Sequence, residues 1–99
     1  MSRKKRATDK TVKYKIITMA GTRCMCCGED FGSEITWHHL KPRYAGGKDT
    51  VENASLLCSN CHRHIHRYQW GTVEYKRLTK KILVNREKFT GCKLDFSFD

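Results

Sequence analysis

The chain has 99 residues and a formal net charge of +10 at neutral pH. A chain this short forms one domain at most and buries a modest core, so we expect a further stabilising element, such as a metal ion. Its apolar runs are too short to cross a membrane, and no amphipathic segment combines large apolar residues with the basic ones. The charge therefore favours a polyanionic partner.

The chain opens with a basic arm of low hydrophobicity, residues 1–10, which we expect to be disordered when free. No apolar run follows its basic residues, so no secretory signal is predicted and the protein is expected in the reducing cytoplasm of a bacterial host cell. Residues 11–99 are expected to form a single domain, which begins with a helix.

Apolar residues at helical spacing predict that first helix over residues 11–20, ending near Gly21. The elements expected after it are a knuckle at 24–28, a strand at 34–40, a loop at 41–53, a strand at 54–57, a helix capped by Ser59 or Asn60 and running to about Tyr68, a helix at 73–84 and a strand at 93–99.

Four of the six cysteines form two C-x-x-C pairs: Cys24 with Cys27, and Cys58 with Cys61. Two intervening residues allow a tight turn to aim both sulfurs at one ion, and two such turns complete a tetrahedron. Four cysteine ligands leave no open coordination position, so this zinc ion would be structural. The turn from Cys24 to Cys26 is too short for easy chelation. The alternative is a set of unrelated buried or redox-active thiols.

The five histidines have a second regular spacing. His62 and His66 are four residues apart on a predicted helix and share one face, from which His64 points away. His38 and His39 are adjacent on a predicted strand, so their side chains point to opposite sides. One of them can bind a metal ion while the other faces a substrate, and His64 is expected on the surface.

These residues occur in a motif that resembles a known one. Trp37-His38-His39-Leu40-Lys41-Pro42, Gly46-Gly47 and the run from Glu52 to Cys61, followed by His62-x-x-x-His66, are similar to the HNH endonuclease motif. The similarity covers about Arg23–Arg67 and is closest to the zinc-knuckle branch, of the small single-domain phage and bacterial type. It implies a small α+β fold in which a ββα-metal finger with a Cys₄ zinc site lies between an N-terminal and a C-terminal helix.

The resemblance also implies a role for each residue. His38, His62 and His66 would bind a catalytic divalent ion, namely Mn²⁺, Ni²⁺, Co²⁺, Mg²⁺ or Zn²⁺. His39 would be the general base that activates water. The side chain of Asn53 would bond across the loop and fix the backbone that holds His39. The products would carry 5′-phosphate and 3′-hydroxyl ends.

Basic residues surround the predicted finger and are expected to contact DNA phosphates, although each of them taken alone could equally be an ordinary solvated charge. Arg67, beside His66, is the first choice for a phosphate clamp. The full set is Lys41, Arg43, Lys48, Arg63 and Arg67.

The function predicted from the sequence is a metal-dependent DNA endonuclease that nicks or cuts with low sequence specificity. One alternative is a non-catalytic, zinc-stabilised nucleic-acid-binding module, and another is an RNA-directed nuclease. His39 separates the first two, because a pure binder has no use for a second histidine beside a metal ligand. DNA is the expected partner, and a recruiting protein, either a phage packaging protein or another, is a possible second one; restriction systems and mobile elements are further settings for such a domain.

Overall fold

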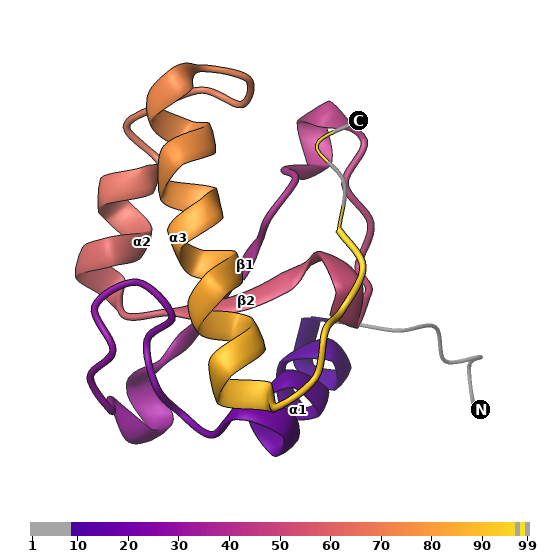
Figure 1. Cartoon of the computed structure of the whole chain (residues 1–99), viewed down its shortest axis with the longest axis vertical. Coiled ribbons are helices and arrows are strands. Elements are labelled where there is room, and N and C mark those ends of the chain that lie inside the picture. Colours follow the sequence, from indigo (N-terminus) through magenta and orange to yellow (C-terminus); the bar gives the residue numbers. More distant parts are fainter. Residues whose placement is uncertain (1–8, 97, 99) are drawn as a thin grey trace, which may run out of the picture.

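The computed structural model describes residues 9–96 and 98, and Figure 1 shows the path of the chain. The described elements are, in chain order, α1 (Asp9–Ala20), η1 (Gly32–Glu34), β1 (Thr36–His39), η2 (Arg43–Ala45), η3 (Val51–Asn53), β2 (Ala54–Leu57), α2 (Ser59–Ile65) and α3 (Val73–Thr90), where η denotes a short 3₁₀ helix. The order β1, β2, α2 is that of a ββα finger, so the predicted small α+β fold is confirmed. No described helix is long and apolar enough to span a membrane.

The two strands form an antiparallel hairpin in which His38 lies opposite Ser55 and His39 opposite Ala54. All four residues of β2 are buried, because α1 and α3 pack against this strand and α2 packs against both strands. Small residues opposite the two histidines leave room for their rings. The hairpin thus presents one histidine to α2 and the next to the following loop.

Helix α1 begins at Asp9, two residues before the predicted start. Its buried face consists of Val12, Ile16 and Ala20, and it ends at Gly21, which has a φ of 81° and donates its N–H to the carbonyl of Ile17 at 2.7 Å. Most of the predicted N-terminal arm, residues 1–8, lies outside the described residues.

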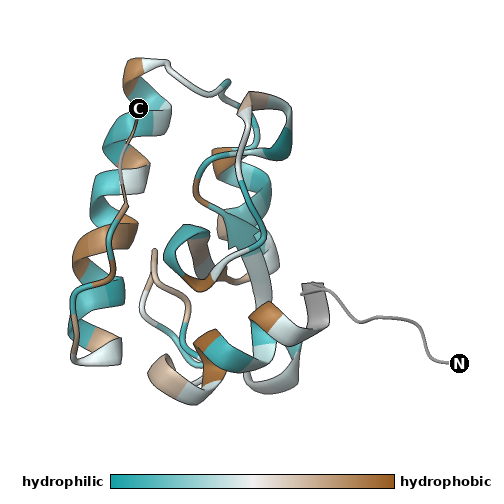
Figure 2. Ribbon diagram, turned by 90° about the vertical axis from the view of Figure 1, so that its right-hand side faces the viewer, coloured by the Kyte–Doolittle hydropathy of each residue, from teal (hydrophilic) through white to brown (hydrophobic). Residues whose placement is uncertain are grey.

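Helix α3 continues to Thr90, six residues beyond the predicted end. Its buried stripe runs through Tyr75, Thr79 and Ile82 and then reaches Arg86, where an apolar residue would be expected. The polar residue at this position made the apolar pattern appear to end early. The helix stops at Gly91, which adopts the left-handed conformation with a φ of 75°. Figure 2 shows the mixture of hydrophilic and hydrophobic residues along α3.

Arg86 is 2% exposed, and its guanidinium donates to main-chain carbonyls. Nη1 reaches the carbonyl oxygens of Glu52 at 2.9 Å and Ala54 at 2.8 Å, with a longer bond to Val51 at 3.4 Å. Nη2 donates to Leu94 at 3.1 Å. A single side chain of α3 therefore holds the end of the loop before β2 and the C-terminal segment in place.

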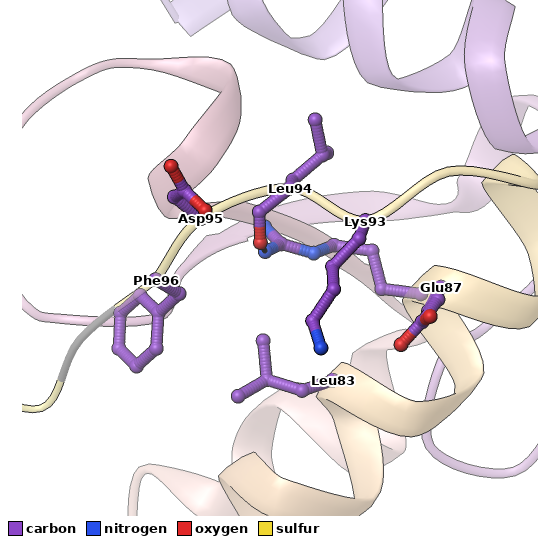
Figure 3. A pocket seen from close by; sticks show the side chains of 7 residues that line it. Leu83, Glu87, Lys93, Leu94, Asp95 and Phe96 are labelled. Atoms are coloured by element: carbon purple, nitrogen blue, oxygen red, sulfur yellow. Dashed lines mark hydrogen bonds between the residues drawn. The ribbon is translucent and has the colours of Figure 1, made fainter.

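The predicted C-terminal strand is not present in residues 93–96, and residues 97 and 99 lie outside the described residues. Leu94 and Phe96 line a small pocket with Leu83 of α3, and Figure 3 shows that the Leu94 side chain points away from Leu83. Farther along, the Phe98 ring stacks on Trp70 with centroids 5.8 Å apart. The alternating pattern does not mark a strand here, because the only described sheet has two strands, which pair with each other.

Candidate metal centres and active site

The two cysteine pairs converge on one point. The Sγ atoms of Cys24, Cys27, Cys58 and Cys61 all lie within 4.8 Å of one another. Met25 helps to place the first knuckle, because its N–H donates to the carbonyl of Leu56 in β2 at 2.7 Å. Cys26 is only partly buried and Cys92 is exposed, and neither belongs to the cluster. The convergence predicted from the C-x-x-C spacing is confirmed.

Helix α2 begins on a cysteine of this cluster. Its N-cap is Cys58, whose Sγ accepts the N–H of Cys61 at 3.5 Å. The predicted cap, Ser59 or Asn60, is wrong, because the Cys58 side chain occupies the capping position and its sulfur accepts the N–H of Cys61. The helix ends at Ile65 rather than near Tyr68, and His66 is its C-cap. The cluster therefore fixes the start of the helix that carries His62 and His66.

The acid–base properties of the cluster fit a bound cation. Burial tends to raise the pKa of Cys24, but backbone N–H groups of Cys27, Cys58 and Cys26 oppose it and lower the pKa to about 7. Burial raises the pKa of Cys61 and of Cys27. Four adjacent sulfurs can all be thiolates only when a cation neutralises them, and a tetrahedral thiolate set is typical of structural zinc.

Three histidines form a second cluster beside the hairpin. His38 of β1 meets His62 and His66 of α2, with ring centroids 5.3 Å and 5.5 Å away, and one ring nitrogen from each lies within 4.8 Å of the others. The four-residue spacing on α2 and the strand position of His38 bring the three rings together. His64 is exposed, and its ring lies against Tyr68.

The state of His38 supports a ligand at this cluster. The side chain is 1% exposed, and both ring nitrogens are buried without a hydrogen-bond partner. Burial, followed by the neighbouring His62 and His66, holds the pKa of His38 well below its ordinary value, so the ring is neutral. A buried nitrogen without a partner is costly, and coordination to a metal ion would satisfy it. The residues therefore fit a divalent ion.

His62 is oriented by a residue that the sequence motif does not contain. Thr36 Oγ1 donates to the carbonyl of Leu57 at 2.7 Å and lies 3.0 Å from His62 Nδ1. Because the hydroxyl proton is used on Leu57, Nδ1 must donate to Thr36, which leaves the Nε2 lone pair for a metal ion. Burial, followed by the neighbouring His66 and His39, also lowers the pKa of His62.

His39 faces the loop side of the hairpin and lines a depression of about 430 Å³ together with the three clustered histidines, Trp37 and Tyr44. Its Nε2 lies 2.6 Å from Asp49 Oδ1. Arg43 Nη2 approaches the other carboxylate oxygen at 3.1 Å. The hydrogen bond with His39 and the nearby Arg43 lower the pKa of Asp49. Sequence reasoning missed Asp49, because the loop that brings it back has no periodic pattern.

The loop between the strands is held by Asn53. Its Oδ1 accepts the N–H of Lys41 at 2.8 Å, and its Nδ2 donates to the carbonyls of Lys41 and Lys48 at 3.1 Å and 2.9 Å. The loop also requires a glycine at position 47, since a Cβ there would lie 1.7 Å from the carbonyl oxygen of Lys41. The bonds of Asn53 cross the loop two residues beyond His39.

The basic residues proposed to contact DNA are distributed over three places. Arg43 lines the histidine depression, and Arg63 lines a neighbouring one with His62 and His66. Lys41 and Lys48 line a separate hollow beside Asn53. Arg67, the first choice for a phosphate clamp, is exposed and lines none of these three. Arg43 and Arg63 are thus the two that share a depression with clustered histidines.

Comparison with known proteins agrees with this geometry. Residues 24–68 match the family model described as HNH endonuclease. The type IV methyl-directed restriction enzyme EcoKMcrA of Escherichia coli K12 is 34% identical over 84 residues, which make up 78% of this chain but only 29% of that enzyme. Anaredoxin of Nostoc sp. is 28% identical over 67 residues, 68% of this chain and 87% of anaredoxin. The matched segment carries both the four-cysteine cluster and the histidine cluster, and the chain belongs to the HNH endonuclease family.

Proposed function

We propose that this domain is a metal-dependent endonuclease that hydrolyses DNA phosphodiester bonds. The observation that carries the proposal is the depression in which His39 lies beside the cluster of His38, His62 and His66. A metal-binding group and an accessible histidine base next to each other are the two components that hydrolysis of a phosphodiester needs. The similarity to a restriction enzyme supports DNA as the substrate class.

Zinc bound by Cys24, Cys27, Cys58 and Cys61 would have a structural role. It would join the first knuckle to the start of α2, and so hold His62 and His66 opposite β1. A second divalent ion, held by the three histidines, would act as a Lewis acid that neutralises charge on the phosphate and assists the departing oxygen. Imidazole ligands favour Mn²⁺, Ni²⁺ or Co²⁺ over Mg²⁺ at this second site.

The chain's own residues would then perform the proton transfer. His39 takes a proton from a water molecule, the water oxygen forms a new bond to phosphorus, and the bond from phosphorus to the 3′ oxygen breaks. Solvent returns a proton to that oxygen, which gives the 5′-phosphate and 3′-hydroxyl ends. Asn53 would keep His39 in place through the backbone of Lys41.

DNA would be held mainly through its phosphates, because the basic residues are spread over the surface and the finger is too small to read many bases. Lys41, Arg43, Lys48, Arg63 and Arg67 are the proposed contacts. Phage packaging proteins as partners and a cytoplasmic location stay predictions. The similarity to a methyl-directed restriction enzyme supports a restriction role more directly than a packaging role, although the chain spans 29% of that enzyme.

Cleavage of supercoiled plasmid DNA tests the proposal. The zinc-loaded protein should convert it to nicked or linear DNA in Mn²⁺, Ni²⁺ or Co²⁺ at least as fast as in Mg²⁺, and EDTA added before the reaction should stop cleavage. Binding of the plasmid without cleavage in every metal would favour the alternative, a zinc-stabilised nucleic-acid-binding module. Faster cleavage of a structured RNA than of plasmid would favour the RNA-directed nuclease.

A further inference from the structure

Asp49 forms the shortest polar contact of His39. Its Oδ1 lies 2.6 Å from His39 Nε2, and the two side chains are 31% and 19% exposed. Arg43 approaches the same carboxylate with Nε at 3.3 Å from Oδ1 and Nη2 at 3.1 Å from Oδ2. The carboxylate is thus held between the imidazole and a guanidinium, and two charge-assisted contacts fix its orientation.

The backbone of Asp49 is fixed as well. The carbonyl of the preceding residue, Lys48, accepts from Asn53 Nδ2 at 2.9 Å. Just before it, Gly47 donates its N–H to the carbonyl of Pro42 at 2.9 Å. The ring of Trp37 also contacts the imidazole, with ring centroids 4.3 Å apart. The contact between Asp49 and His39 therefore joins two restrained groups and is not a chance meeting of mobile side chains.

The contact decides which nitrogen of His39 carries a proton. An ionised carboxylate only accepts hydrogen bonds, so Nε2 must be the protonated nitrogen of the neutral ring. The lone pair then lies on Nδ1. Among the described residues Nδ1 has no hydrogen-bond partner, and it is absent from the buried unpaired atoms. It is open to solvent on a side chain that lines the depression.

We propose that Asp49 is a positioning residue for the reaction: it holds His39 as the Nε2–H tautomer, so that Nδ1 receives the proton from the attacking water. This inference rests on the proposed nuclease function. When the proton arrives at Nδ1, the ring becomes an imidazolium that keeps its Nε2 proton, and the adjacent carboxylate stabilises the new charge. Asp49 itself gains no proton. Arg43 keeps the carboxylate oriented from its other side.

The decisive variant is Asp49→Asn, which keeps the shape of the side chain but removes its charge. Its amide can donate to Nε2 and so stabilise the opposite tautomer. We expect kcat for plasmid nicking to fall about 10- to 100-fold, which is less than the roughly 10²–10⁴-fold that loss of the general base itself would cost, and KM to change less than about threefold. Asp30→Asn is the matched control, since Asp30 is exposed and bonds only to Thr22 and Gly32 in the described structure, away from the histidines.

A readout independent of cleavage separates this inference from the proposed function. Long-range ¹H–¹⁵N NMR of the zinc-loaded protein, at a pH where His39 is neutral, should show Nε2 protonated and Nδ1 unprotonated in the parent and in Asp30→Asn. Asp49→Asn should lose this preference while retaining zinc and the parent's DNA affinity. Failure of the parent to cleave, with these NMR results intact, would overturn the nuclease proposal while supporting the positioning of His39 by Asp49. A protonated Nδ1 in the parent, or an Asp49→Asn protein that retains its tautomer and more than half of kcat, would overturn the inference.

Discussion

Replacing Arg86 with methionine should destabilise the domain substantially. The change keeps an unbranched apolar stem but removes the donors that serve four main-chain carbonyls. The bond to Ala54 is fully buried, and leaving such a carbonyl unpaired costs about 1–3 kcal/mol. The other three are partly buried and should cost about 0.5–1.5 kcal/mol each. Part of this is offset, because methionine needs no guanidinium to be desolvated. We expect a net loss of roughly 2–4 kcal/mol.

Urea unfolding followed by tryptophan fluorescence in zinc-containing buffer measures this loss. With the dependence of the unfolding free energy on urea that is typical of a small domain, the urea concentration at the midpoint of unfolding should fall by roughly 1–2 M. Arg77→Met is the control: Arg77 lies on the exposed side of the same helix, so its replacement should change the stability by less than about 0.5 kcal/mol. A midpoint for Arg86→Met that matches the control would refute the account of Arg86 as the anchor of the loop before β2.

Three further predictions concern metals and DNA. Native mass spectrometry after dialysis against EDTA should show one retained zinc per chain, and Cys58→Ser should lose both the zinc and the fold; a stable, zinc-free parent would contradict this. Thr36→Val should weaken Ni²⁺ binding measured by calorimetry about 10- to 100-fold without loss of zinc, and unchanged affinity would show that His62 needs no such orientation. The logarithm of the binding constant for a DNA duplex should fall steeply with the logarithm of the salt concentration, with a slope of about 0.9 per neutralised phosphate. Deleting residues 1–8, which removes four basic side chains, should flatten this slope. A shallow slope in the parent, or a preference beyond about a hundredfold for one of two unrelated duplexes, would indicate base recognition.

The metal-binding clusters could be predicted because their geometry is local. Two residues between Cys24 and Cys27, and again between Cys58 and Cys61, allow the sulfurs of each pair to face one ion. A separation of four residues places His62 and His66 on one helical face. Local spacing does not say how the two cysteine pairs meet, or how His38 meets His62 and His66. The resemblance to the HNH motif supplied that arrangement.

The residues that the sequence did not indicate act through tertiary contacts. Asp49 reaches His39 because Asn53 and Gly47 shape an irregular loop, and no periodic pattern encodes such a path. Thr36 lies on β1 like any strand threonine, and only the position of α2 places it beside His62. Arg86 occupies a buried stripe where its charge is satisfied by carbonyls of another segment, so the pattern of apolar residues broke off too early.

The C-terminal segment shows the limit of alternation as a signal. Leu94, Phe96 and Phe98 alternate as they would in a strand, but burial of alternate side chains is also what an extended segment needs when it lies along a helix. Phe96 lines a pocket with Leu83 of α3, and the Leu94 carbonyl accepts a hydrogen bond from Arg86. A strand also needs a partner edge, which a pattern within one segment cannot supply.

The most direct test of the central claim is the rate of plasmid nicking by the parent and by His39→Ala, at saturating protein and in the metal that supports the fastest reaction. Fluorescence anisotropy on a duplex and zinc analysis should show that both proteins bind DNA and zinc equally. The account predicts that His39→Ala loses cleavage by about 10²–10⁴-fold, as expected for a lost general base. A variant that retains more than about a tenth of the parent's rate, or a parent that does not cleave in any metal, would contradict it.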